Sequence, residues 1–67
     1  MVGNHLKEIR SNVGLTQEDL ATQSGVTRQT IISMEKGNYS PSVLLALRLS
    51  EALKCSVEEI FYVKTDH

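Results

Sequence analysis

Residues 17–36 read QEDLATQSGVTRQTIISMEK, and this stretch decides which fold the rest of the chain must complete. Its pattern predicts two short helices joined by a tight turn at Ser24-Gly25-Val26, where glycine avoids Cβ strain. At about 100° per residue, Thr27, Ile31 and Met34 fall on one side of the second helix, the side that can pack. The opposite side spans an arc of roughly 140° and carries Arg28, Gln29, Ile32, Ser33 and Lys36. Polar donors of this kind read the edges of DNA bases, so we interpret this segment as a recognition helix.

Apolar spacing and capping residues predict three further helices. Before the central stretch, Leu6, Ile9 and Val13 recur at intervals of three and four residues, which is one apolar stripe of a helix. After it, Ser40-Pro41 is a typical helix start, with a serine cap followed by proline at the first position. Ser56 caps a last short helix that has two glutamates in its first turn. The expected helices span about residues 4–12, 17–23, 27–36, 41–53 and 57–61.

Within these helices the caps and the buried sides can also be assigned. Thr16 and Asp19 have the spacing of a capping box, and Thr27 is placed to cap the following helix. The core side of the fourth helix is expected to consist of Val43, Leu45, Ala46, Leu49, Ser50 and Leu53. The tail from Tyr62 to His67 leaves two alternatives open. Residues 61–64 favour a strand but have no evident partner strand in the chain, so the tail is either disordered or pairs with a second copy.

Length and composition restrict the class of protein. A chain of 67 residues with one cysteine makes a single domain, residues 1–67, without an internal disulfide, which fits a reducing compartment. No stretch approaches the roughly 20 apolar residues that a membrane-spanning helix needs. Charged residues come too early at the N-terminus for a signal peptide. We therefore expect a soluble, cytoplasmic protein.

The distribution of charge is more informative than its total. The formal net charge is −1, which by itself does not favour nucleic acid as a partner. Residues 25–48, however, contain three cations, Arg28, Lys36 and Arg48, against the single anion Glu35, a net charge of +2. The positive surplus therefore coincides with the recognition helix. A monomer with so few cations should make few phosphate contacts, which favours a dimer.

Other kinds of site are not indicated by the residue pattern. His5 and His67 lie at opposite ends of the chain without metal-ligand spacing, so no metal site is expected. Cys55 is expected to pack between the fourth and fifth helices. Glu58 and Glu59 are better explained by the first turn of a helix than by catalysis, and there is no nucleophile with an adjacent base. We expect no enzyme, no cofactor and no small-molecule site.

The chain resembles the Cro/CI/Xre-type helix-turn-helix regulators, the family of the phage lambda and related repressors. The resemblance covers about residues 4–61 and rests on the runs TQEDLA (16–21), GV (25–26), TRQTI (27–31), MEKG (34–37), SPS (40–42) and VEEIF (57–61). It is strongest for small stand-alone members, including a cytolysin-operon repressor type that binds as a dimer. The resemblance implies an all-α fold, a compact five-helix bundle of the lambda-repressor-like DNA-binding type, with a short C-terminal strand as an open alternative.

The resemblance also assigns roles to individual positions. The implied DNA contacts are Gln17, Thr27, Arg28, Gln29, Thr30, Ser33, Lys36, Asn38 and Tyr39. Among them, Arg28, Gln29 and Ser33 match positions that read bases, whereas Gln17 and the segment 36–39 match positions along the phosphate backbone. Arg10 and Glu35 match a largely buried salt bridge between the first and third helices. Ile32 departs from the family, which often has a polar residue there.

These observations predict a regulator that binds double-stranded DNA, most simply a homodimeric repressor on a pseudo-palindromic operator. The residues considered for the dimer interface are Leu44, Leu47, Phe61, Tyr62 and Val63. Two alternatives remain open: a protein-interaction or antitoxin-like module with the same fold, and a small activator or controller protein.

Overall fold

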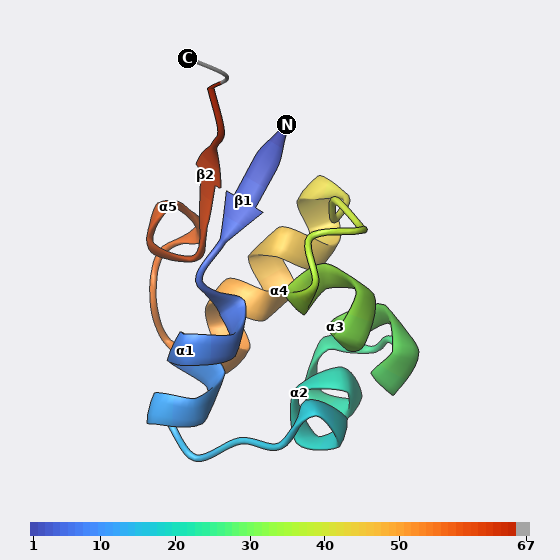
Figure 1. The fold of residues 1–67 in the computed structure, drawn as a ribbon. Helices are drawn as coiled ribbons and strands as arrows, with labels where there is room; N and C mark the ends of the chain where they lie inside the picture. The colour runs from blue at the N-terminus through green and yellow to red at the C-terminus, as the bar shows by residue number, and fades with distance from the viewer. Residues whose placement is uncertain (66–67) are drawn as a thin grey trace.

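The computed structural model describes residues 1–65 as five helices and two short strands (Figure 1). In chain order the elements are β1 (Val2–Asn4), α1 (Leu6–Asn12), α2 (Gln17–Ser24), α3 (Arg28–Glu35), α4 (Val43–Leu53), α5 (Val57–Ile60) and β2 (Phe61–Val63). The expectation of a five-helix bundle is therefore confirmed, and the all-α description needs a small two-stranded sheet added to it. The end of the predicted tail, residues 66–67, lies outside the described residues.

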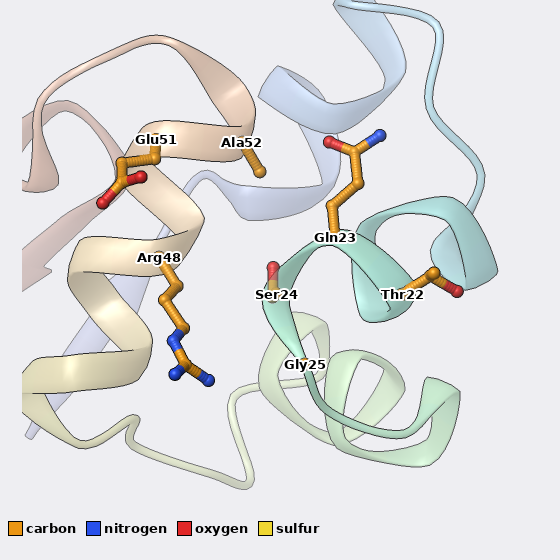
Figure 2. A pocket seen from close by; sticks show the side chains of 7 residues that line it. All are labelled: Thr22, Gln23, Ser24, Gly25, Arg48, Glu51 and Ala52. Atoms are coloured by element: carbon orange, nitrogen blue, oxygen red, sulfur yellow. The ribbon is translucent and has the colours of Figure 1, made fainter.

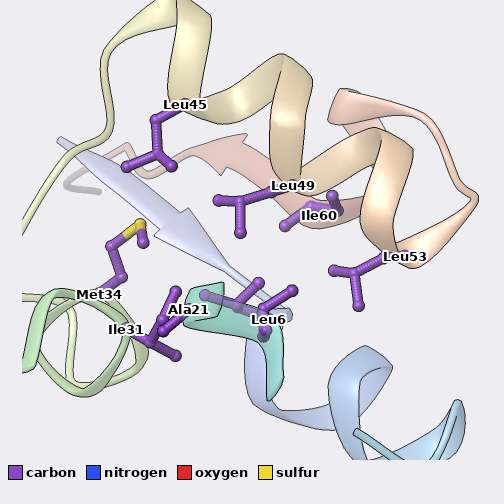
Figure 3. Close-up of a cluster of buried hydrophobic side chains, with 9 residues drawn as sticks. Leu6, Ala21, Ile31, Met34, Leu45, Leu49, Leu53 and Ile60 are labelled. Carbon is purple, nitrogen blue, oxygen red and sulfur yellow. The ribbon is translucent and has the colours of Figure 1, made fainter. Parts of the chain in front are cut away.

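Every helix contributes at least one side chain to a single apolar core (Figure 3). Its buried members are Leu6, Leu20, Ala21, Ile31, Met34, Leu45, Leu49, Leu53 and Ile60. The three leucines of α4 are spaced four residues apart, so they form one stripe that lies along the other helices. Burial of this cluster holds α2 and α3 against α4 and so fixes the presentation of the recognition helix.

Three residues assigned to the packing side are exposed instead. Val13 follows the end of α1 and is 50% exposed, because the helix stops at Asn12 before its stripe reaches that position. Val43 is 78% exposed because it is the first residue of α4, beyond the edge of the core. Thr27 is exposed because its side chain serves as the N-cap of α3. Ala46 and Ser50 are half-buried at the margin of the α4 stripe.

Local capping explains where most helices begin. Thr16 and Asp19 form the expected capping box at α2, and Ser56 with Glu59 forms another at α5. Gly25 ends α2 with φ of +74°, a left-handed conformation that favours glycine. The predicted start of α4 is two residues too early: Ser42, not Ser40, accepts the backbone N–H of Leu45 at 3.1 Å. Pro41 therefore precedes the cap, and residues 38–41 belong to the connection from α3.

The tail does have a partner strand within the chain, so the expectation that none exists is wrong. β1 and β2 pair antiparallel, with Gly3 opposite Tyr62, and the pairing continues through the hydrogen bond from His5 N–H to the Ile60 carbonyl. Asn4, which was expected to begin the first helix, is the last residue of β1. The sequence does not predict β1 as a strand, because three residues with a central glycine show no alternation of apolar and polar side chains. The two strands therefore lie together at one side of the bundle, next to α5 (Figure 1).

No helix within residues 1–65 is long and apolar enough to cross a membrane.

Candidate nucleic-acid interface

The helix α3 separates a buried face from an open one, as its sequence indicates. Ile31 and Met34 are fully buried, whereas Arg28 and Gln29 at its first turn are exposed. Its N-terminus is held by Thr27, whose hydroxyl accepts the backbone N–H of Thr30 at 3.3 Å. Because the buried pair is anchored in the core, the first turn of α3 projects from the molecule in a fixed direction.

The sequence-predicted contact residues lie on α2, on α3 with its N-cap, and in the loop that follows α3. Thr27, Arg28, Gln29, Lys36 and the loop residues Asn38 and Tyr39 are exposed. The remaining predicted contacts, Gln17, Thr30 and Ser33, are half-buried on α2 and α3. Ile32, where the family often has a polar residue, is half-buried as well.

Beneath this surface, α1 and α3 are joined by an ion pair. Arg10 Nε lies 2.6 Å from Glu35 Oε2, and the two side chains are only 12% and 5% exposed. The same guanidinium donates to the Leu15 carbonyl oxygen at 2.8 Å. Since both charges have partners, the pair can be buried without leaving an unsatisfied group. It fixes the C-terminal end of α3 to α1 and to the loop before α2.

The amide of Gln17 extends this ion pair towards the surface. Gln17 Nε2 donates to Glu35 Oε1 at 3.1 Å, and the guanidinium of Arg28 lies 3.5 Å from Gln17 Oε1. Four side chains from α1, α2 and α3 are thus connected in the order Arg10, Glu35, Gln17 and Arg28. The family resemblance implies a phosphate contact for Gln17 and does not predict its hydrogen bond to Glu35.

An open cleft of about 420 Å³ lies at the N-terminus of α2. It is lined by Arg10, Thr16, Gln17, Glu18 and Arg28. The first backbone N–H groups of a helix have no partner within the helix, and they carry the positive end of its dipole. The exposed guanidinium of Arg28 and this helix start suit a phosphate group, whereas the guanidinium of Arg10 is already bound to Glu35 and to the Leu15 carbonyl oxygen.

Comparison with known proteins identifies the arrangement. The family model described as Helix-turn-helix matches residues 6–60. An uncharacterized HTH-type transcriptional regulator of Methanothermobacter thermautotrophicus is 53% identical over 62 residues, covering 91% of this chain and 90% of the relative. The regulator YgzD of Bacillus subtilis, also of this HTH type, is 42% identical over 64 residues, covering 96% and 97% of the two chains.

Solved structures agree with this comparison. The restriction-modification controller protein C.AhdI from Aeromonas hydrophila superposes with a TM-score of 0.76 at 37% identity, over 81% of this chain and 82% of that one. The N-terminal DNA-binding domain of SinR from Bacillus subtilis gives a TM-score of 0.72 at 28% identity, over 79% and 78%. The chain belongs to the Cro/CI-type helix-turn-helix family. It is a transcriptional regulator with a DNA-binding domain, and α2 and α3 are its helix-turn-helix pair.

In this regulator Asn4 supports the recognition helix, a role that the sequence pattern does not predict. Asn4 Nδ2 donates to the Met34 carbonyl oxygen at 2.8 Å, at the end of the recognition helix α3, while Asn4 Oδ1 accepts the Leu6 N–H at 3.0 Å. The side chain therefore links β1 to both α1 and α3. An asparagine side chain that accepts the backbone N–H two residues later is a common local turn, so the bond from Leu6 N–H follows from the sequence. The bond to the Met34 carbonyl oxygen depends on the tertiary fold.

Two titratable groups of the regulator have shifted pKa values. The Thr16 backbone N–H and hydroxyl lower the pKa of Asp19 below its ordinary value of 3.8, which keeps the capping carboxylate charged. Burial, reinforced by the negative charge of Glu59, raises the pKa of the Cys55 thiol. Cys55 packs half-buried against the core, so the thiolate form is disfavoured there. Within residues 1–65 no three His, Cys, Asp or Glu side chains gather as a metal site would require.

Proposed function

We propose that this helix-turn-helix regulator is a homodimeric repressor that binds a pseudo-palindromic operator with α3 in the major groove. The observation that carries the proposal is the exposed first turn of α3, with Arg28 and Gln29, supported from beneath by the buried Arg10–Glu35 pair. Repression would follow because a bound dimer occludes RNA polymerase. Such a role places the protein in the cytoplasm with the chromosome.

The contact residues divide into two groups under this proposal. Arg28 and Gln29 would read base edges, with Ser33 one turn later and the hydroxyls of Thr27 and Thr30 close to base or backbone. The phosphate contacts would come from Gln17 at the start of α2 and from Lys36, Asn38 and Tyr39 after α3. Ile32, half-buried beside them, is placed to contact a thymine methyl group.

Dimerisation is supported by apolar side chains that the monomer leaves uncovered. Leu44 and Leu47, one turn apart on α4, are 59% and 51% exposed. At the strand end, Tyr62 and Val63 are exposed as well, while Phe61 packs against the core. In such a dimer the two α3 helices would enter major grooves about one DNA turn, roughly 34 Å, apart.

The oligomeric state tests the dimer directly. Sedimentation equilibrium of the wild type should show a dimer, and Leu47→Lys should shift the protein to monomer because it places a charge in the interface. Val13→Lys is the matched control, since Val13 is as exposed as Leu47 but lies at the C-terminal end of α1, not on α4. A wild-type protein that stays monomeric at hundreds of micromolar, with and without DNA, contradicts the dimer.

The DNA-binding proposal is tested by in vitro selection from a random duplex library, followed by fluorescence-anisotropy titration at two salt concentrations. The wild type should enrich one two-fold symmetric sequence and bind it with strong salt dependence. Arg28→Ala should weaken binding to the selected duplex by about 5- to 150-fold, the range for losing one bidentate base contact. Lys7→Ala, which removes one exposed charge from α1, should have a much smaller effect.

A second candidate function is an interaction module that holds a protein partner. It is favoured by the exposed Leu44 and Leu47 and by the formal net charge of −1. Under this alternative the leucine variants impair activity in cells and Arg28→Ala does not. A third candidate is a small activator or controller protein, and the similar protein C.AhdI is a restriction-modification controller. A reporter gene placed behind the selected operator distinguishes activation from repression.

A further inference from the structure

A second open cleft, of about 500 Å³, lies between the C-terminal end of α2 and α4 (Figure 2). It is lined by Thr22, Gln23, Ser24, Gly25, Arg48, Glu51 and Ala52. The sequence pattern does not predict such a site, because its two walls come from helices that only the apolar core brings together. Since Gly25 belongs to the wall, an occupant of the cleft would contact the turn that joins α2 to the recognition helix.

The hydroxyl of Ser24, in the wall of this cleft, lacks a hydrogen-bond partner. Ser24 is 0% exposed, and within residues 1–65 its Oγ is the one buried side-chain polar atom that is left unpaired. Such a group lowers stability, because it has lost its bonds to water and gained none in exchange. A change of rotamer would turn the hydroxyl towards an occupant of the cleft, to which it could donate its hydrogen.

Arg48 supplies a positive charge to the same cleft. Its side chain extends from α4 towards the end of α2 in Figure 2, and Arg48 Nη1 lies 3.0 Å from the position that a Cβ at Gly25 would occupy. Within residues 1–65 the ion pairs involve His5 and Arg10, so Arg48 has no acidic partner. A guanidinium offers only donors and binds a carboxylate through two parallel hydrogen bonds. A carboxylate in the cleft could therefore accept hydrogen bonds from both Arg48 and Ser24.

The negative charges around the cleft select among anions. Glu51 also lines the cleft, although its carboxylate is directed away from α2 in Figure 2. The C-terminal end of α2 carries the negative end of the helix dipole. Both features oppose an anion, and the opposition grows with the charge of the ligand. A singly charged carboxylate is therefore favoured over a doubly charged phosphate.

An apolar hollow of about 300 Å³ adjoins the cleft, because Gln23 and Ala52 line both. Its other lining residues are Val13, Leu15, Leu53 and Lys54. Val13 is 50% exposed and Leu15 is half-buried, so the core leaves part of their apolar surface uncovered. A ligand with its carboxylate at Arg48 could place an apolar body against this surface and remove it from water.

We propose that the cleft and the adjoining hollow form one binding site for a small monocarboxylate with an apolar body. Arg48 binds the carboxylate, Ser24 donates a further hydrogen bond to it, and Val13 and Leu15 contact the apolar part. None of the residues assigned to DNA lines this site. The inference therefore does not depend on the proposed function.

Titration of the full chain with hexanoate, followed by ¹H–¹⁵N correlation spectra, tests the site. The wild type should show saturable shifts in the amide signals of residues 22–25 and 48–53. Acetate has the same charge with almost no apolar body, and hexanol has the apolar body without the charge. Each should bind at least about tenfold more weakly than hexanoate. Equal shifts with all three probes, or shifts centred on the start of α2, would contradict the site.

The carboxylate contact is tested by Arg48→Gln, which removes the charge and keeps a polar side chain. It should weaken hexanoate binding by about 10- to 150-fold, the range for losing a hydrogen bond to a charged group. Lys7→Gln is the matched control, because it removes an exposed positive charge from α1. Hexanoate binding that is lost in Arg48→Gln and kept in Lys7→Gln supports the inference. Binding that persists in Arg48→Gln overturns it.

Ser24→Ala separates binding from folding. It removes the unpaired hydroxyl, so the thermal unfolding midpoint should not fall, while hexanoate binding should weaken about fivefold. A lowered midpoint with unchanged hexanoate binding would mean that the hydroxyl serves the fold and would overturn the inference. The absence of saturable shifts in the wild type up to the solubility limit of hexanoate would overturn it as well. Neither result bears on operator selection, so failure of this inference and failure of the proposed function are distinguishable.

Discussion

The two ends of this small regulator are built in different ways. The helix-turn-helix, residues 16–37, is specified by caps, a turn glycine and a polar network that links α1, α2 and α3. The opposite end is formed by β1, α5 and β2, where the two strands meet through three residue pairs. In the first region, local signals set the helices, and a polar network and the apolar core then join them to one another and to α4. In the second region, the strand pairing joins residues nearly the full chain length apart, so substitutions should affect the two regions differently.

The largest loss of stability is expected where the helix-turn-helix depends on its long-range ion pair. Glu35→Ala should lower the free energy of unfolding by about 3 to 5 kcal/mol, because it leaves the Arg10 guanidinium buried without its partner. Urea unfolding followed by circular dichroism measures the loss. Glu8→Ala, at an exposed site on α1, is the control and should cost little. A loss below about 1 kcal/mol for Glu35→Ala would show that the ion pair is not a main support of this region.

At the opposite end the sensitive residue is a glycine. A methyl group at Gly3 would collide with the Tyr62 ring, which lies directly over that position. Gly3→Ala should therefore destabilise the protein by about 1 to 3 kcal/mol through displacement of the ring or the strand. In the Tyr62→Ala background the same substitution should be nearly neutral, since the obstacle is gone. Equal effects in both backgrounds would mean that the glycine is needed for another reason.

A smaller effect is expected from the local caps, and it should be similar in the two regions. Thr16→Ala at α2 and Ser56→Ala at α5 should each cost about 1 kcal/mol, because each removes the acceptor for an orphan backbone N–H. Thermal unfolding of the two variants beside the wild type provides the measurement. A much larger loss of stability in Ser56→Ala than in Thr16→Ala would indicate that the end formed by β1, α5 and β2 depends strongly on α5, although this helix has only four residues.

The smallest effect concerns acid pH. The pKa of Asp19 is below 3.8 in the folded protein because Thr16 donates hydrogen bonds to its carboxylate. The unfolded chain therefore binds this proton first, so the stabilisation is present above about pH 4 and is lost as the pH falls through the lowered pKa. Asp19→Asn should remove this part of the pH dependence between pH 4 and pH 2, as followed by urea unfolding. An unchanged acid profile in the variant would contradict the role of the capping box.

The comparison of the two ends also explains which features could be predicted from the sequence. The helix-turn-helix boundaries, the buried Ile31 and Met34 and the exposed Arg28 follow from a helical period and from caps that act within four residues. The β1 strand could not be predicted, because Val2–Asn4 has neither length nor alternation and exists only through its pairing with Phe61–Val63. The same applies to the bond from Asn4 to Met34 and to the displaced start of α4 at Ser42.

The sequence by itself determined the five helices, the capping box at Thr16, the helix cap at Ser56 and the segregation of polar and apolar faces on α3, because these depend on interactions between near neighbours. The tertiary structure alone decided the strand pairing at the termini and the direction in which the Gln17 amide points. That amide lies between Glu35, eighteen residues away, and Arg28, eleven residues away, on a different helix. No local pattern specifies such a contact, since it forms only when the apolar core has brought α1, α2 and α3 together.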